Sequence, residues 1–287
     1  MDPIWNGMDQ ATLDREYDAR ASVADFELEM RRYAEKSAAA RAALPVRKGL
    51  VFDEGSGERL DWFPGRPGAP VLLWMHGGFW RALGRADNHC VAPGLVAAGA
   101  HVAVMDYTLV PGANLDEIVR QARACCTWTA AQAEAMGADP GRLFVGGHSA
   151  GGQLAGMLVA EGWPAPPIQG AVGLSGLYDL EPVRLSEANG WMKLDVAASA
   201  RLSPIRHIPR RGPAPPLLLA YGGRETAEFK RQTEDYARAW AERGWEANVV
   251  TRPERNHFDL VVALGDGADP LCRAVAAFMG LEPGEEP

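Results

Sequence analysis

The sequence has few cysteines and no long apolar run, and each absence excludes a class of protein. Four cysteines among 287 residues are too few for a disulfide framework, and no Cys-x-x-Cys pair is present to bind zinc or support redox chemistry. No stretch approaches the ~18–20 apolar residues that cross a bilayer, and the first residues lack a basic start and apolar core typical of a secretory signal. We therefore expect a cytoplasmic protein without membrane contact. The cysteines, expected to be buried thiols in a reducing compartment, are Cys90, Cys125, Cys126 and Cys272.

Positive charge is also scarce in this chain. The sequence has 29 Lys and Arg against 37 Asp and Glu, which gives a formal net charge of −8. An acidic surface does not attract a phosphate backbone, so nucleic acid is excluded as an expected partner. The length fits one large domain, and we predict a single domain over residues 1–287.

Short continuous apolar runs alternate with helical patterns through most of the chain. Such runs are typical of strands that are covered on both faces, as in a parallel sheet. Among the helices, Asn114 and Glu117 form a capping-box-like start, and Gly137 follows as an end signal. The alternation predicts an α/β fold, with a mostly parallel central sheet and helices on both faces. The strand-like runs are residues 71–75, 101–107, 143–145, 171–174, 217–221 and 247–250.

Two segments depart from this alternation. Residues 9–43 are rich in Ala, Arg and Glu, with apolar residues at loosely helical spacing, and Pro45 ends the segment. We predict an N-terminal helical arm over residues 1–45, which could pack over the cap or form a homodimer. Residues 179–216 carry six prolines, so we predict a cap-like insertion over a site instead of a part of the sheet.

A serine between two glycines has the surroundings of a catalytic nucleophile. Gly-His-Ser-Ala-Gly at residues 147–151 follows the strand-like run 143–145 and precedes a helical pattern at 153–159. Strand, sharp turn and helix is the context of a nucleophile elbow, whose tight turn needs small residues two positions before and after the serine. The helix start also offers backbone N–H groups to an anion. The pattern predicts Ser149 as the nucleophile.

A second glycine-rich strand end supplies candidate oxyanion donors. His-Gly-Gly-Phe-Trp at residues 76–80 follows the apolar run 71–75, where the backbone can approach a substrate closely. We assign the donors to the amides of Ala150, Gly78 and Phe79, and the sequence leaves open which of the last two dominates. An apolar aromatic pocket nearby is predicted from Trp80, Tyr178 and Trp191, although for Trp191 a place in the core is an equal alternative.

Chain order selects the general base and the acid. Elbow hydrolases place the serine first, then the acid, then the histidine, and His257 is the one histidine in a late loop after a strand-like run. The acid should lie in the loop that follows the run 217–221, and Glu225 lies in that loop. Glu228 lies in the first turn of the next helix, where the helix dipole favours any acidic residue. We predict Glu225, with Asp179 as the alternative.

Several motifs together carry a resemblance to a known family. They are His-Gly-Gly-Phe-Trp at 76–80, Gly-His-Ser-Ala-Gly-Gly at 147–152, Ser-Gly-Leu-Tyr-Asp-Leu at 175–180 and Glu225-x-x-Glu228-Phe229, with further similarity at 15–20 and 194–205. Over nearly its whole length the sequence resembles the arylformamidase (kynurenine formamidase) branch of the α/β-hydrolase superfamily. The resemblance implies an α/β-hydrolase fold, a serine nucleophile, the oxyanion loop at 76–80, and no required metal or cofactor. This chain carries Glu225 where eukaryotic arylformamidases usually carry Asp.

The residues therefore predict a serine hydrolase that cleaves a small-molecule carboxylic ester or aryl-formamide bond, such as that of an N-formylkynurenine-type substrate. A general short-chain carboxylesterase is the alternative. A metal hydrolase is disfavoured because the chain lacks a His-Glu-x-x-His motif. A non-catalytic binding protein of the same fold would require loss of a triad member, yet Ser149, Glu225 and His257 are all in place.

Overall fold

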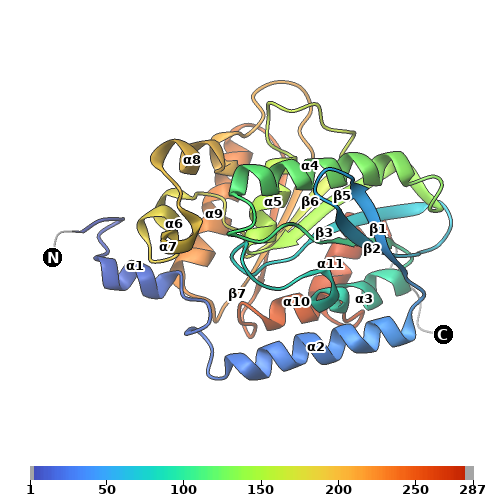
Figure 1. Cartoon of the computed structure of the whole chain (residues 1–287), viewed down its shortest axis with the longest axis horizontal. Helices are drawn as coiled ribbons and strands as arrows, with labels where there is room; N and C mark the ends of the chain where they lie inside the picture. The colour runs from blue at the N-terminus through green and yellow to red at the C-terminus, as the bar shows by residue number, and fades with distance from the viewer. Residues whose placement is uncertain (1–2, 282–287) are drawn as a thin grey trace.

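The centre of the molecule is one mixed sheet (Figure 1). The computed structural model describes residues 3–281, and within them eight strands pair in the order β1-β2-β4-β3-β5-β6-β7-β8. Strands β1 and β2 are antiparallel to their neighbours, whereas β4, β3, β5, β6, β7 and β8 run parallel. The mostly parallel sheet predicted from the apolar runs is confirmed. The strands are β1 Arg47–Asp53, β2 Glu58–Phe63, β3 Ala69–Met75, β4 His101–Met105, β5 Ala138–His148, β6 Gly170–Leu174, β7 Leu217–Gly222 and β8 Ala247–Arg252.

Helices cover both faces of the sheet, as predicted. Helices α4, α5 and α9 pack on one face, and α3, α10 and α11 cover the other, with α2 outside them. Asn114 caps α4 by accepting a hydrogen bond from the backbone N–H of Glu117. The α-helices are α1 Gln10–Glu16, α2 Phe26–Ala43, α3 Ala92–Ala97, α4 Leu115–Gln132, α5 Ala150–Leu158, α6 Glu181–Leu185, α7 Asn189–Met192, α8 Val196–Arg201, α9 Ala227–Glu242, α10 Asp259–Leu264 and α11 Pro270–Phe278; short 3₁₀ turns are η1 Arg85–Asp87, η2 His89–Val91 and η3 Pro204–Arg206.

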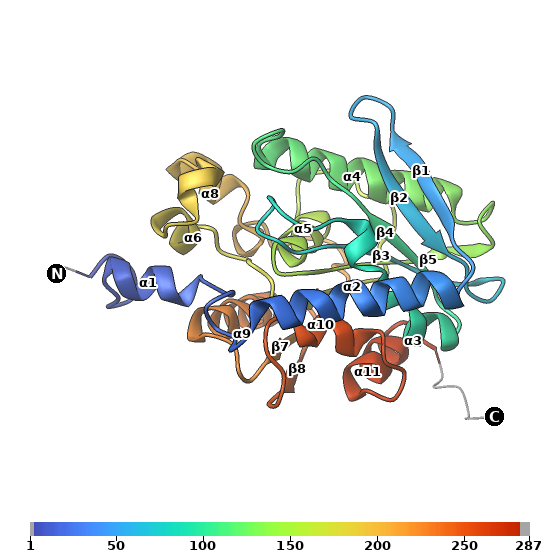
Figure 2. The ribbon, with the colours of Figure 1, turned by 60° about the horizontal axis from the view of Figure 1, so that its bottom comes forward.

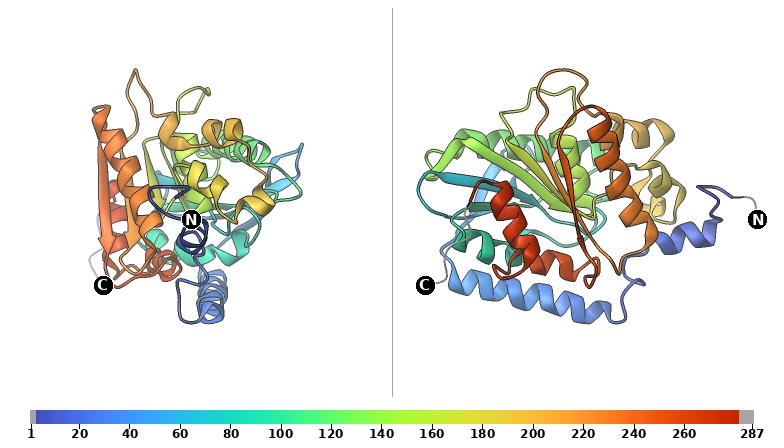
Figure 3. Two further views of the ribbon diagram at one scale, coloured as in Figure 1. Left: turned by 90° about the vertical axis from the view of Figure 1, so that its left-hand side faces the viewer. Right: turned by 180° about the vertical axis from the view of Figure 1, so that it is seen from behind.

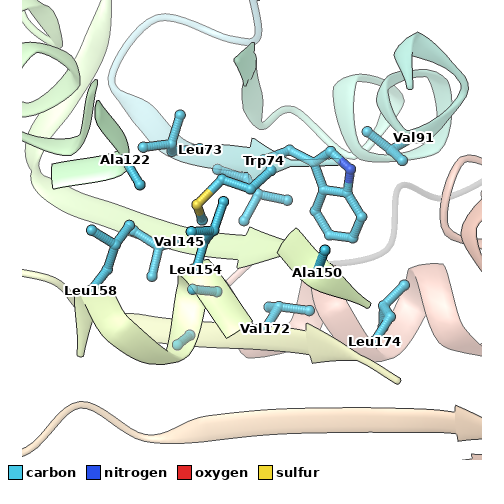
Figure 4. Packing of buried hydrophobic residues seen from close by; sticks show 14 of the residues in the cluster. Leu73, Trp74, Val91, Ala122, Val145, Ala150, Leu154, Leu158, Val172 and Leu174 are labelled. Atoms are coloured by element: carbon cyan, nitrogen blue, oxygen red, sulfur yellow. The ribbon is translucent and has the colours of Figure 1, made fainter. Parts of the chain in front are cut away.

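The core lies between the sheet and its helices. Figure 4 shows Leu154 and Leu158 of α5 packing against Val145 of β5 and Val172 of β6, which are all buried. The four cysteines are also buried, with free thiols, in agreement with their predicted place in the core. Within residues 3–281, no helix combines the length and the apolar character that a membrane crossing needs.

The antiparallel pair β1–β2 has no counterpart among the predicted strands. Strand β1 lies at the edge of the sheet, and six of its seven side chains are at least partly exposed. An edge strand needs no continuous apolar run, because it is not covered on both faces. The continuous apolar run that predicted the central strands is therefore missing at β1.

The arm and the insertion flank the carboxyl ends of the parallel strands. In Figure 2, α1 lies beside α6, and α2 crosses in front of the sheet; seen from behind in Figure 3, α2 runs below the red helices α10 and α11. Hydrogen bonds join α1 to the insertion, from Gln10 Nε2 to the Leu185 carbonyl at 2.9 Å and from the Glu187 N–H to Asp14 at 2.6 Å. The arm thus contacts the same end of the molecule at which the predicted site lies.

Candidate active site

Ser149 lies in a strained turn between β5 and α5. Its φ of +55° lies in the left-handed region, which a serine adopts only when its surroundings enforce it. Its N–H donates to the Leu174 carbonyl of β6 at 2.8 Å. A Cβ atom on Gly147 or Gly151 would overlap backbone, at the carbonyl of Gly151 and of Met75 respectively. The glycines are therefore required by close approach of the chain, as predicted for a nucleophile elbow.

His257 and Glu225 form a buried hydrogen-bonded pair. His257 Nδ1 lies 2.7 Å from Glu225 Oε2, and both side chains are almost fully removed from solvent. The other carboxylate oxygen accepts hydrogen bonds from Ser175 Oγ and from the N–H of Gly222, each at 2.6 Å. A carboxylate accepts only, so Nδ1 must carry a proton here, which leaves Nε2 free to accept one.

The alternative acid lies elsewhere. Asp179 Oδ1 accepts a hydrogen bond from the Glu181 N–H at the start of α6, and its backbone groups bind the Gln232 side chain. The structure therefore brings Glu225, and not Asp179, to His257.

The imidazole of His257 is packed between two rings. Its centroid lies 4.3 Å from the ring of Phe229 and 4.4 Å from the ring of His148, the residue that precedes Ser149. Burial, and then the neighbouring His257, lowers the pKa of His148 well below its usual value. His148 is therefore neutral near pH 7 and adds no competing charge beside the base.

The loop after β3 has an unusual backbone. Gly78, Phe79 and Trp80 follow one another with φ values of +102°, +49° and +55°. Tyr107 holds the loop from behind by donating its hydroxyl to the His76 carbonyl at 2.9 Å, while its ring stacks on the His76 imidazole at 4.1 Å. Strain at successive residues is typical of functional loops and fixes the direction of their N–H groups.

One cavity connects these groups. A cavity of about 470 Å³ is lined by Ser149, His257, Gly78 and Phe79, and Ala150 follows Ser149 as the first residue of α5. Within residues 3–281, no three His, Cys, Asp or Glu side chains gather to hold a metal ion. The aromatic lining residues are Tyr17, Phe26, Tyr33, Phe79, Trp191 and Phe258.

Of the three predicted pocket aromatics, only Trp191 lines this cavity. Trp80 is fully buried, and its indole N–H donates to Gln153 of α5 at 3.3 Å. Tyr178 is also buried and stacks on Tyr236 of α9, with 4.3 Å between the ring centroids. The prediction that Trp80 and Tyr178 line the pocket is therefore corrected. Both residues neighbour site motifs in the sequence, but their side chains are buried in the core.

Sequence reasoning missed the contribution of the arm. Tyr17, Arg20, Phe26, Met30 and Tyr33 all line the cavity. The loosely helical spacing of the four apolar and aromatic residues was visible in the sequence, but no local signal indicates which surface such a segment covers. Arg20 lies outside that pattern, in the turn between α1 and α2. Ser175 was noted within a motif, and its role as a partner of Glu225 follows only from the pairing of β6 with β7.

A parallel sheet with a serine elbow at the carboxyl end of a central strand, facing a histidine–carboxylate pair, defines the α/β-hydrolase class. The alpha/beta hydrolase fold family matches residues 72–259. The chain therefore belongs to this family, and the predicted α/β-hydrolase fold is confirmed.

Similar proteins are hydrolases of related kinds. A kynurenine formamidase of Salmo salar is 27% identical over 96% of this chain and 98% of its own length. Esterase LipI of Mycobacterium tuberculosis is 35% identical over 51% of this chain and 48% of its own. A crystal structure of a putative thioesterase from Silicibacter superposes with a TM-score of 0.78 and 27% identity, over 90% of this chain and 97% of that one. These similarities show that the chain is a hydrolase related to formamidases and carboxylesterases.

Proposed function

We propose that the protein is a serine hydrolase that cleaves aryl-formamide bonds through an acyl-enzyme. The observation that carries the proposal is the buried hydrogen bond between His257 and Glu225, because His257 lines the same cavity as Ser149. A full-length similarity to a kynurenine formamidase supports the formamide as substrate. Aromatic side chains around the cavity suit an aryl leaving group.

The mechanism follows from these positions. Ser149 Oγ attacks the formyl carbon while His257 Nε2 takes its proton, and Glu225 stabilises the imidazolium that forms. The N–H groups of Ala150 and of Gly78 or Phe79 bind the developing oxyanion. His257 then gives the proton to the leaving arylamine nitrogen. Water attacks the formyl-enzyme by the same route and releases formate.

The experiment compares N-formylkynurenine with a panel of aryl esters that includes p-nitrophenyl acetate. We expect a higher kcat/KM for the formamide, and Ser149→Ala should lower turnover of both substrate classes by at least ~10⁴-fold, as loss of a triad nucleophile does. Ser37→Ala is a matched control, since Ser37 is a fully buried serine of α2 that does not line the cavity.

The outcomes separate the alternatives. Turnover of esters alone would replace the proposal by a short-chain carboxylesterase, a function that the similarity to mycobacterial esterases also supports. Turnover that survives in Ser149→Ala, or none with either substrate class, would contradict the serine mechanism.

A further inference from the structure

Two arginines from distant parts of the sequence line the cavity of Ser149. Arg81 follows the oxyanion loop, and Arg20 lies between α1 and α2 of the arm. Within residues 3–281, neither guanidinium forms an ion pair or a hydrogen bond; each instead lies against an aromatic ring. Both residues are exposed where they line the cavity, so their charges are accessible to a ligand that enters it.

Each guanidinium is held on an aromatic ring of the cavity. Arg81 Cζ lies 3.5 Å from the ring centroid of Trp191, and Arg20 Cζ lies 4.8 Å from that of Phe26. Stacking fixes the plane of a guanidinium but leaves the N–H groups at its edge free to donate. Both guanidinium groups thus retain their hydrogen-bonding capacity.

The two cations repel each other across the cavity. Burial lowers the pKa of Arg81, the charge of Arg20 lowers it further, and Glu187 acts in the opposite direction. An anion that binds between the arginines would relieve this repulsion.

Three carboxylates line the cavity, and two of them are already engaged. The third, Glu187, raises the pKa of Arg81, but within residues 3–281 it forms no ion pair with either guanidinium. Asp14 Oδ1 accepts hydrogen bonds from Gln10 Nε2 and from the Glu187 N–H. Asp18 Oδ1 accepts from the N–H groups of Arg20 and Ala21. These carboxylates stabilise the arm and its contact with the cap, and they do not pair with the guanidinium groups.

We propose that Arg20 and Arg81 form a subsite for a carboxylate carried by the substrate, an inference that rests on the proposed function. The subsite is connected to the reaction centre, because the ring of Trp191 that carries Arg81 also contacts Phe79 of the oxyanion loop, with 6.1 Å between centroids. A planar guanidinium matches a carboxylate with two parallel hydrogen bonds. The preferred substrates are therefore anionic members of the ester or formamide class.

The test uses matched substrate pairs and variants that keep the packing. Formanilide is compared with 2-formamidobenzoate, and 4-nitrophenyl butyrate with mono-4-nitrophenyl succinate, so that the carboxylate is placed on either side of the scissile bond. Arg81→Met and Arg20→Met retain an apolar stem on the aromatic ring but remove the charge. Arg81→Lys keeps the charge without the planar fork. Arg243→Met removes an exposed arginine that does not line the cavity.

We expect Arg81→Met to lower kcat/KM for the anionic member of at least one pair by about 10-fold or more, mainly through KM. The neutral member should change less than about 3-fold, Arg81→Lys should recover part of the loss, and Arg243→Met should leave the ratio unchanged. The wild-type preference should also weaken with added salt. Equal effects on charged and neutral members of both pairs would overturn the subsite.

Turnover of the neutral substrates tests the proposed function separately. If none is hydrolysed, calorimetric titration with phthalate and with its neutral diamide still decides the subsite. Tighter binding of phthalate that is lost in Arg81→Met supports the carboxylate subsite without the reaction. Equal binding of the two compounds contradicts it.

Discussion

At the scale of single residues, the carboxylate of Glu225 is the most constrained group in the site. It is fully removed from water, yet His257, Ser175 and the Gly222 N–H all approach it within 2.7 Å. A buried carboxylate is tolerated only when such partners replace its hydration. Ser175 and Gly222 bind one oxygen and His257 the other, so the acid has a single orientation toward the imidazole. Glu225 is thus a rigid support for the proposed base.

Replacing Ser175 by alanine tests this support. Hydrogen bonds to charged groups contribute about 1.5–3 kcal/mol, so Ser175→Ala should lower kcat by about 10- to 100-fold with little change in KM. The loss should stay below the ~10⁴-fold typical when the acid itself becomes an amide. Ser37→Ala is the control, because Ser37 is a buried serine whose two hydrogen bonds lie outside the site. Its kcat should be unchanged. Full activity of Ser175→Ala would show that Glu225 does not need the Ser175 hydroxyl to support His257.

At the scale of elements, the arm supports the loops that carry the site. Asn256 donates to Glu29 of α2 at 3.0 Å, and Phe258 packs edge-on against Phe26, so both neighbours of His257 contact the arm. Close to α1, Tyr17 donates its hydroxyl to Glu228 of α9 at 2.8 Å. The arm therefore completes the cavity wall and holds the base loop from outside.

Removing the Tyr17 hydroxyl should loosen the arm without unfolding the sheet. Tyr17→Phe leaves the buried Gln232 amide, which donates to that hydroxyl at 2.8 Å, without one partner, at a cost of about 1–3 kcal/mol. We expect amide hydrogen exchange in residues 10–25 to accelerate by about 10- to 100-fold, with a raised KM. Tyr221→Phe, which removes an exposed hydroxyl bond to Glu234, is the control. Unchanged exchange in Tyr17→Phe would mean that other contacts alone hold the arm.

At the scale of the whole molecule, buried histidines make folding sensitive to acid. Burial lowers the pKa of His76 from 6.5 to about 4. The unfolded chain therefore binds a proton more readily than the folded one, and stability is lost as the pH falls below 6.5 toward 4. From this side chain alone, the free energy of unfolding should fall by ~2 kcal/mol between pH 7 and pH 5.

Denaturant unfolding of the wild type and of His76→Asn measures this contribution. Asparagine keeps a side-chain N–H that can replace the His76 contact with the Gly77 carbonyl, but it does not titrate. Between pH 7 and pH 5, the free energy of unfolding of His76→Asn should fall by ~2 kcal/mol less than that of the wild type. Between pH 7 and pH 8, the difference in free energy of unfolding between the two proteins should stay constant. Parallel stability curves down to pH 5 would exclude His76 as a source of acid sensitivity.

How far the site could be predicted depended on the kind of signal. Ser149 and the glycines around it form a local turn, whose geometry depends on neighbouring residues and is therefore visible in the sequence. Trp80 and Tyr178 are equally close to motifs, but the direction of a side chain depends on what packs against it, and both point to helices that are distant in the sequence. The arm was predicted as helical from its spacing, while its place over the cavity was not.

The sequence by itself determined the parallel sheet, the strand ends that carry the glycine-rich loops, and the order of serine, acid and histidine. The sheet and the strand ends follow from periodicity and turn chemistry, which act over a few residues. The order of the three residues follows from the chain order of elbow hydrolases. Only the tertiary structure decided that Glu225 and not Asp179 meets His257, that Ser175 holds the acid, and that Arg20 joins Arg81 at one cavity. Such contacts depend on strand order and on the docking of the arm, which bring together side chains separated by tens of residues or more.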